Sequence, residues 1–212
     1  MIIYVIVAVI AYLIGSVNFS ILISKKMAGF DVREKGSGNA GTTNVLRSVG
    51  KKAAIITLIC DILKGVITIL LSLVLGNITK SNTALLCQIG AIEVAVGHTF
   101  PIFFGFKGGK GVATSLGIIL VLNWKIGLIC LLFALSIMAI TKMVSLGSVS
   151  AAILFAILTI FITDGYIAQG NYIVFGIILA GFVLFNHREN IKRIAKGEEN
   201  KLSFKKNKEE EK

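Results

Sequence analysis

A glycine- and lysine-rich stretch interrupts an otherwise apolar chain: Gly97-His-Thr-Phe-Pro-Ile-Phe-Phe-Gly-Phe-Lys-Gly-Gly-Lys-Gly-Val-Ala-Thr114. Its second half, Lys107-Gly-Gly-Lys-Gly111, lies directly between two apolar segments. Glycine allows the backbone to approach a ligand closely and to direct N–H groups at it, and lysine supplies positive charge. The stretch therefore predicts a phosphate-binding loop at a membrane surface, between two spanning helices.

The composition of the chain excludes an ordinary soluble domain. Of its 212 residues 55% are hydrophobic, and the mean hydropathy is +0.86, both beyond the values of soluble domains. The single proline, Pro101, leaves long helices uninterrupted. A net charge of +11 is compatible with nucleic-acid binding, but its grouping between apolar segments is typical of a membrane protein that follows the positive-inside rule. We therefore expect a membrane protein and no nucleic-acid partner.

Apolar segments predict the membrane spans, because about 20 helical residues cross a hydrocarbon core of about 30 Å. These segments are 1–23, 53–75, 82–104, 112–142, 148–163 and 171–185. The fourth is interrupted at Asn123-Trp124-Lys125, so it is one long helix or two short ones, and the count is six or seven. The first 23 residues lack a basic n-region and a cleavage site, which indicates a retained span rather than a signal peptide.

The distribution of lysine and arginine decides between six and seven spans. With seven, the basic residues of 24–52, of the glycine loop, at Lys142 and of the tail from Asn186 onward all lie on one side. Only Lys80 and Lys125 then lie opposite, whereas six spans would move the basic tail across. The positive-inside rule therefore favours seven.

The expected fold class is an all-α, polytopic membrane helix bundle with seven transmembrane helices, the N-terminus outside and the C-terminus cytoplasmic. Trp124 and Lys125 would then be an outer-interface anchor, and the segment 112–122 would be too short to span alone without thinning the bilayer or packing on neighbours. We expect residues 1–204 to form a single integral membrane domain and the charged tail 205–212 to be disordered.

Charged residues inside spans are costly and usually paired or functional. Asp61 and Lys64 lie three positions apart and can pair on one helix, whereas Glu93 has no local partner in the sequence. We expect all three to face the bundle and to support the site from behind. The cysteines have no metal-ligand spacing, so no metal site is expected: Cys60, Cys87 and Cys130.

The first polar motif is Gly36-Ser-Gly-Asn-Ala-Gly-Thr-Thr-Asn-Val-Leu-Arg47. Its glycines match the dinucleotide-binding pattern G-x-G-x-x-G by letter, but that pattern requires a preceding strand, which a helical membrane chain does not supply. What remains is a polar loop rich in hydroxyls and amides, ending in Arg47, whose guanidinium can bind a phosphate through two hydrogen bonds. A phosphate-binding loop is favoured over a solvated linker.

The glycine loop is not a nucleotide-binding Walker loop. Only three residues separate Gly105 from Gly109, and Gly111 replaces the Ser or Thr that would hold Mg²⁺. His98, at the end of a span, is interpreted as a hydrogen-bonded structural histidine rather than a catalyst. Further hydroxyls come from the predicted turn Ser145-Leu-Gly-Ser148.

The third motif follows the last span, between Asn186 and Lys201. On a helix His187 and Asn190 share one face, and histidine can exchange a proton near physiological pH. The run is equally compatible with a basic flank of the positive-inside type.

With these three motifs in this order, the chain resembles the bacterial acyl-phosphate:glycerol-3-phosphate acyltransferase family (PlsY type), from Met1 to Lys201. Thr42, Asn186 and the pair Ile194-Ala195 depart from the family pattern. The resemblance implies a multi-pass protein of the bacterial inner membrane whose active site faces the cytoplasm. It implies transfer of a fatty acyl group from acyl phosphate to the sn-1 hydroxyl of glycerol-3-phosphate, which gives lysophosphatidic acid and phosphate in the first step of phospholipid synthesis.

The resemblance also assigns roles. The catalytic residues it implies are Ser37, Arg47, Lys107, His187 and Asn190. The substrate-binding residues are Asn39, Gly41, Thr43, Asn44, Gly108, Gly109, Lys110, Gly111 and Ser145. Glu199 is expected to be structural. Acyl phosphate is already activated, so neither a cofactor nor a metal is needed, and the partners are acyl phosphate, glycerol-3-phosphate and membrane lipid.

The proton and the reaction path stay open at the level of the sequence. Direct attack, with a substrate phosphate oxygen as proton acceptor, is the family pattern. His187 as general base is the alternative, and an acyl-enzyme on Ser37 is disfavoured because the sequence shows no base beside it.

Two other functions compete with acyl transfer. An organic-phosphate transporter would show repeats and a binding site near the bilayer midplane, whereas the polar groups here cluster at one surface. A purely structural membrane protein that recruits partners through its basic tail would leave the glycine loops unexplained.

Overall fold

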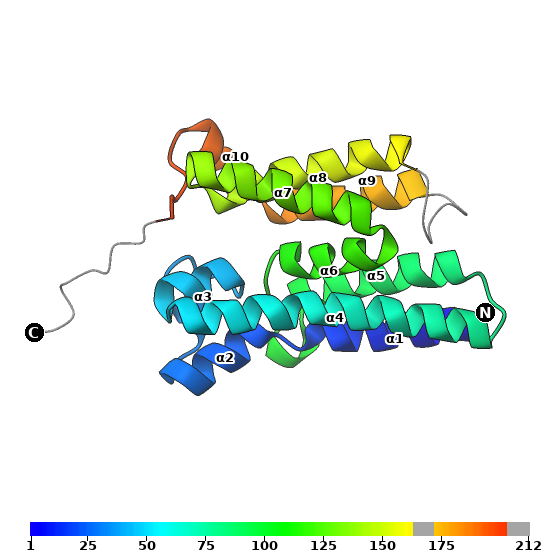
Figure 1. The fold of residues 1–212 in the computed structure, drawn as a ribbon. Coiled ribbons are helices and arrows are strands. Elements are labelled where there is room, and N and C mark those ends of the chain that lie inside the picture. The colour runs from blue at the N-terminus through cyan, green and yellow to red at the C-terminus, as the bar shows by residue number, and fades with distance from the viewer. Residues whose placement is uncertain (163–171, 203–212) are drawn as a thin grey trace, which may run out of the picture.

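The computed structural model describes residues 1–162 and 172–202, and every regular element in these ranges is helical (Figure 1). The α-helices are α1 (Ile2–Ser16), α2 (Phe19–Ala28), α3 (Thr42–Ser48), α4 (Lys51–Ile78), α5 (Thr83–Thr99), α6 (Val112–Leu122), α7 (Trp124–Thr141), α8 (Val144–Phe161), α9 (Tyr172–Asn186) and α10 (Arg188–Ala195). Two 3₁₀ turns are η1 (Val32–Glu34) and η2 (Ile102–Phe104). The predicted tail 205–212 lies outside the described residues.

Length and apolar composition identify five helical segments that can cross a membrane: α1 with α2, α4, α5 with η2, α7 and α8. The pair α9 and α10 makes a sixth if it is counted as one span, although it bends by 65°. Helix α6 is apolar but shorter. The all-helical membrane fold is therefore confirmed, with five or six candidate spans among the described residues.

The break predicted near Asn123 is confirmed. The Asn123 side chain accepts a hydrogen bond from the backbone N–H of Ile126 at 3.2 Å and so caps the start of α7. A second such cap interrupts the first predicted span, because Asn18 accepts from Ile21 and starts α2 as a new helix. The predicted turn at Ser145 is wrong: α8 begins at Val144, so this serine lies in its first turn.

Helix α4 has its polar side inward, as expected of a membrane helix. One face carries buried polar residues at helical spacing: Thr57, Asp61, Lys64, Thr68 and Ser72. The opposite face exposes large apolar side chains that suit lipid: Ile55, Ile59, Leu63, Ile67 and Leu70. The hydroxyls of the inner face donate to backbone carbonyls one turn earlier, so the face is polar but largely satisfied.

Glycines allow two pairs of helices to approach until their backbones touch. A Cβ at Gly97 of α5 would lie 2.2 Å from the carbonyl oxygen of Tyr12 in α1. A Cβ at Gly117 of α6 would lie 2.1 Å from the carbonyl oxygen of Ile62 in α4. These contacts hold α5 against α1 and α6 against α4.

Figure 1 shows two layers, with α1 to α6 in one and α7 to α10 in the other. Helix α3, the end of α2 and helix α10 lie at one end of the molecule, opposite the N-terminus (Figure 1). The first and third sequence motifs therefore meet at the same end of the bundle, although they are far apart in the chain.

Candidate functional site

A cavity of about 1010 Å³ lies between the two layers. One wall comes from the first motif, α4 and α6, and the other from α7, α8, α9 and α10. Its polar part is lined by residues of the motifs, among them Ser37, Arg47 and Lys110. Its apolar part is lined by Leu131, Ala134, Leu135, Phe155 and Leu179. The cavity thus suits a molecule with an anionic end and a hydrocarbon end.

Asn44 holds the first motif in shape. It is buried, its Nδ2 donates to the carbonyls of Val32 at 2.8 Å and Lys35 at 3.0 Å, and its Oδ1 accepts from the N–H of Ser37 at 2.9 Å. Gly36 has a φ of +61°, and a Cβ there would lie 2.3 Å from the Asn44 oxygen. Asn44 therefore acts by positioning the Ser37 backbone, while Ser37 and Arg47 lie in the cavity lining.

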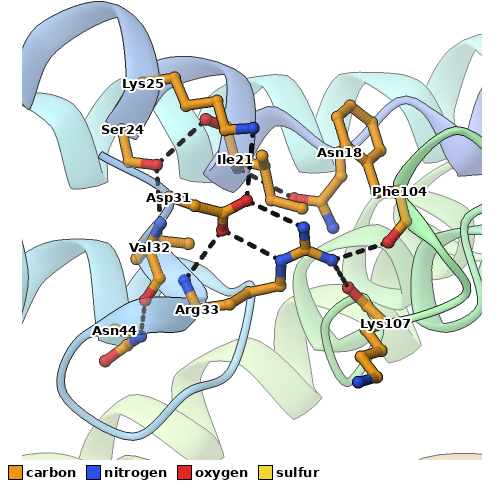
Figure 2. A network of polar contacts seen from close by, with 10 residues as sticks. All are labelled: Asn18, Ile21, Ser24, Lys25, Asp31, Val32, Arg33, Asn44, Phe104 and Lys107. Atoms are coloured by element: carbon orange, nitrogen blue, oxygen red, sulfur yellow. Dashed lines mark hydrogen bonds and ion pairs between the residues drawn. The ribbon is translucent and has the colours of Figure 1, made fainter. Parts of the chain in front are cut away.

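A second network joins the segment just before the first motif to the glycine loop (Figure 2). Arg33 donates from Nη1 to the carbonyls of Phe104 at 2.7 Å and Lys107 at 3.0 Å, while its Nε and Nη2 donate to the Asp31 carboxylate at 3.0 and 2.8 Å. The hydrogen bond from Arg33 lowers the pKa of Asp31 to about 2, and Asp31 raises the pKa of Arg33. Lys25 adds an ion pair to Asp31 at 3.5 Å.

The backbone N–H groups of Gly108 and Gly109 are used within the protein. They donate to the carbonyls of Thr99 at 2.9 Å and His98 at 3.1 Å. A Cβ at Gly108 would lie 2.0 Å from the His98 oxygen, and one at Gly109 would lie 2.2 Å from the His98 ring nitrogen Nε2. These glycines are therefore needed for close packing against the end of α5 rather than for amides free to bind a ligand.

The amides that remain available lie one turn further on, at the start of α6. Val112 and Ala113 line the cavity, and their N–H groups have no acceptor among the described residues. Gly111 precedes them with a φ of +83°. The hydroxyl of Ser115, in the same turn, is buried with no partner in 1–162 and 172–202, and Ser115 belongs to the cavity lining. A helix start with free amides attracts phosphate.

Glu199 organises the third motif. Its Oε1 accepts from Ser145 Oγ and Asn190 Nδ2, both at 2.8 Å, and its Oε2 accepts from Arg193 Nε at 2.9 Å. Burial alone would raise the pKa of Glu199, but these three hydrogen bonds outweigh it and lower the pKa. Asn190 in turn accepts a hydrogen bond from Lys110. The Glu199 carboxylate therefore joins α8 to α10 directly and the glycine loop through Asn190.

Two groups beside this carboxylate have shifted pKa values. Burial, together with the positive charge of Arg193, lowers the pKa of Lys110 to about 8. Burial also lowers the pKa of His187, in the bend after α9, to about 4. The Nδ1 of His187 lies 2.8 Å from the carbonyl oxygen of Val183. Because a carbonyl cannot donate, Nδ1 carries the proton and the neutral ring has its lone pair on Nε2.

The predicted pairing of Asp61 with Lys64 is confirmed, at 3.0 Å, and both are buried. The Lys64 ammonium also donates to the carbonyls of Gly15 and Val17, each at 3.1 Å, and lies 2.8 Å from His98 Nδ1. This cluster ties the bend between α1 and α2 to α4 and α5. Asp61 and His98 both reach the cavity lining.

Most residues that the sequence predicts for the site are brought together by the fold. Those in the cavity lining are Ser37, Asn39, Gly41, Thr43, Asn44, Arg47, Lys110, Gly111, Ser145, His187 and Asn190. Those outside it are Lys107, Gly108 and Gly109. The Lys107 side chain is exposed and points away from the Arg33 network in Figure 2. Lining residues that the sequence did not single out as ligands include Thr42, Ser115 and Arg193.

The amino-acid sequence is similar to a known family and to named proteins. A family model described as "Glycerol-3-phosphate acyltransferase" matches residues 5–197. A "Glycerol-3-phosphate acyltransferase" of Clostridioides difficile (strain 630) is 44% identical over 96% of this chain and 97% of its own length. One of Neisseria meningitidis serogroup C is 40% identical over 92% of this chain and 96% of its own.

The fold has solved relatives as well. A crystal structure of PlsY (YgiH), an integral membrane glycerol 3-phosphate acyltransferase, in its glycerol 3-phosphate form, superposes with a TM-score of 0.82 at 33% identity and covers 94% of this chain and 96% of that one. The lysophosphatidic acid form of PlsY gives a TM-score of 0.79 at 34% identity, with 94% and 95% covered.

Proposed function

Because this chain belongs to the glycerol-3-phosphate acyltransferase family, we propose that it transfers a fatty acyl group from acyl phosphate to the sn-1 hydroxyl of glycerol-3-phosphate. The products are lysophosphatidic acid and phosphate. One observation carries the proposal: a single cavity joins cationic and hydroxyl groups of the three motifs to an apolar space between helices. The solved relatives bound to glycerol 3-phosphate and to lysophosphatidic acid support the acceptor and the product.

Two anion-binding regions support a pair of phosphorylated substrates. One is the first motif, with Ser37 and Arg47. The other is the start of α6, with the free amides, Ser115 and Lys110. Charge-assisted hydrogen bonds contribute roughly 1.5–3 kcal/mol each, so two or three suffice to hold both substrates. The acyl chain would occupy the apolar part beside Phe155 and Leu179.

Direct attack fits this arrangement. The sn-1 oxygen forms a bond to the acyl carbon, the bond from that carbon to the phosphate oxygen breaks, and phosphate leaves with the electron pair. Orientation of the two substrates can supply up to about 7–11 kcal/mol of the barrier. No cofactor is required, because acyl phosphate is an activated anhydride.

The hydroxyl proton needs an acceptor. His187 presents a lone pair on Nε2, but with a pKa of about 4 it is a weak base. A phosphate oxygen, whose second pKa is about 6, is the stronger base. Substrate-assisted transfer to phosphate is therefore favoured, with His187 as a hydrogen-bond acceptor that orients the attacking hydroxyl.

The topology we propose has seven transmembrane helices, the N-terminus outside and the active site on the cytoplasmic side of a bacterial inner membrane. The grouping of basic residues at the end of the bundle that carries α3 and α10 supports this orientation. Helix α6 would be the additional span that makes seven, held in place by the close contact of Gly117 with α4. Residues 1–204 would form one domain.

The test is formation of lysophosphatidic acid by the purified protein in lipid nanodiscs. Labelled glycerol-3-phosphate is supplied with palmitoyl phosphate, and with palmitoyl-coenzyme A in a parallel reaction. Formation of product in the reaction with palmitoyl phosphate, but not in the reaction with palmitoyl-coenzyme A, supports the proposal. Product from the thioester alone would refute the donor, and uptake of glycerol-3-phosphate into liposomes without acylation would instead favour a transporter.

A further inference from the structure

His98 lies near the end of α5, beside the buried ion pair of Asp61 and Lys64. It is 3% exposed, and its Nδ1 lies 2.8 Å from the ammonium of Lys64. A lysine ammonium has donors and no acceptor, so Nδ1 must be the unprotonated nitrogen. The neutral imidazole then carries its proton on Nε2.

Lys64 is held firmly in this role. Its remaining N–H groups are directed at the carbonyls of Gly15 and Val17, each at 3.1 Å, and Asp61 neutralises its charge from 3.0 Å. The cluster is buried between α1, α4 and α5. The three N–H groups of Lys64 thus serve the two carbonyls and Nδ1, and the Asp61 carboxylate lies beside them, 3.0 Å from the ammonium and 3.6 Å from Nδ1.

The Nε2–H has no hydrogen-bond acceptor among the described residues, and His98 belongs to the cavity lining. Nε2 lies beside Gly109, where a Cβ would approach it to 2.2 Å. Lys110, Gly111 and the start of α6 follow directly in the chain. The amides of Val112 and Ala113 and the hydroxyl of Ser115 belong to the same cavity lining, and they too have no partner among the described residues.

We infer that His98 donates a hydrogen bond from Nε2 to a phosphate oxygen bound at the start of α6, and that Lys64 positions it by fixing its tautomer. This inference rests on the proposed function only for the identity of the phosphate, which is that of acyl phosphate or that of glycerol-3-phosphate. His187 has the opposite tautomer, with Nδ1–H on Val183. The site thus combines one histidine that donates with one that accepts.

The two histidines are the only ones in the chain, so nitrogen NMR of protein labelled with ¹⁵N-histidine tests the inference on the wild type. The variant His187→Gln assigns the signals. We expect the Nε2–H form for His98 and the Nδ1–H form for His187, and a saturable shift of the His98 Nε2–H signal on addition of inorganic phosphate. An Nδ1–H form of His98, or no shift at saturating phosphate, would overturn the inference. This measurement does not depend on acyl transfer, so it can succeed or fail independently of the proposed function.

A matched pair of variants tests the same point by kinetics. In His98→Asn the amide oxygen can still accept from Lys64, but nothing reaches the Nε2 position. In His98→Gln the amide nitrogen replaces Nε2 as a donor. We expect His98→Asn to raise KM for one phosphorylated substrate, and Ki for inorganic phosphate, roughly 10-fold or more, and His98→Gln to restore most of the loss.

The substrate whose KM rises identifies the phosphate that His98 contacts. Equal defects in His98→Asn and His98→Gln, or a fall in kcat alone, would indicate a packing role and contradict the inference.

Discussion

The guanidinium of Arg33 donates a hydrogen bond to the backbone carbonyl of Lys107 at 3.0 Å, and the same nitrogen reaches the carbonyl of Phe104. Arg33, which lies just before the first motif, thus holds both Phe104 and Lys107, the two ends of the turn that precedes Lys110 (Figure 2). Asp31 fixes the orientation of Arg33 through two further hydrogen bonds. The shape of the glycine loop therefore depends on Arg33 and Asp31, neither of which belongs to the cavity lining.

Replacing Arg33 with lysine should loosen this turn. A lysine keeps the charge but cannot match the planar fork that serves Asp31 and two carbonyls together. We expect Arg33→Lys to lower kcat/KM about 10-fold, mainly through KM for a phosphorylated substrate, because Lys110 loses its fixed position. Steady-state kinetics with each substrate varied in turn provide the measurement. Asp31→Asn is the matched variant, and an unchanged KM in both would refute the positioning role.

Much of the fold follows from apolar length alone, and the break at Asn123 was predictable from its polar side chain. The interruption at Asn18 was not, because one capping amide within a continuous apolar segment resembles any other polar residue in a span. The start of α8 at Val144 was missed for the converse reason. Ser145 and Ser148 resemble a turn in sequence, yet they lie on the buried side of the first turns of a helix.

The site was predictable as a set of motifs but not as a set of contacts. That Gly108 and Gly109 pack against His98 depends on the position of α5 behind the loop, which no local pattern reveals. The hydrogen bonds of Arg33 to the glycine loop, and those of Ser145, Asn190 and Arg193 to Glu199, likewise depend on tertiary structure. Ser115 follows the glycine loop closely in the sequence, but only the structure shows that its hydroxyl is buried with no partner among the described residues.

Replacement by alanine should lower kcat/KM much more at Arg47 than at Lys107. Arg47 lines the cavity and can form charge-assisted hydrogen bonds to a phosphate, so Arg47→Ala should lose about 2–3 kcal/mol of transition-state binding, roughly 30- to 150-fold in kcat/KM. The Lys107 side chain is exposed and outside the lining, so Lys107→Ala should lose only about 3-fold, the scale of a surface charge. The resemblance to the family implies a catalytic Lys107. Comparable losses in both variants would support that role and contradict the one inferred from the geometry.

Glu199 should prove essential for the shape of the third motif without contacting substrate. Its carboxylate holds Ser145, Asn190 and Arg193. Glu199→Ala leaves the buried Ser145 and Asn190 and the partly exposed Arg193 without their acceptor. We expect at least about a 10-fold loss of kcat/KM together with a lower melting temperature. In Glu199→Gln one oxygen can still accept from Ser145 and Asn190, so the loss should be smaller. Activity and thermal unfolding in detergent give the comparison, and equal effects of the two variants would argue against this role.

Activity should fall at alkaline pH through Lys110. Its pKa is lowered to about 8, first by burial and then by the charge of Arg193. The ammonium is therefore mostly charged below pH 8, where we expect it to bind phosphate, and it becomes neutral as the pH rises through that value. We expect kcat/KM to decline above about pH 8, and kcat to decline only at higher pH, because bound phosphate stabilises the charged form. In Lys110→Arg the side chain stays charged, so this alkaline limb should disappear even if the overall rate is lower. A limb that persists unchanged in Lys110→Arg would assign it to another group.

Chemical labelling should decide the topology. Trp124 is 63% exposed at the start of α7, and with seven spans it lies at the outer surface. A cysteine in its place should react with an impermeant maleimide added to intact cells, whereas one at Lys196, beyond α10, should react only after lysis. Cys60 is only partly buried, so the reporters belong in a background with Cys60 changed to serine, and Cys87 and Cys130 are buried. Labelling of Trp124→Cys only after lysis would contradict the seven-span topology. If α6 and α7 formed a re-entrant pair, five helices would cross the membrane, and the N-terminus and α10 would still lie on opposite sides.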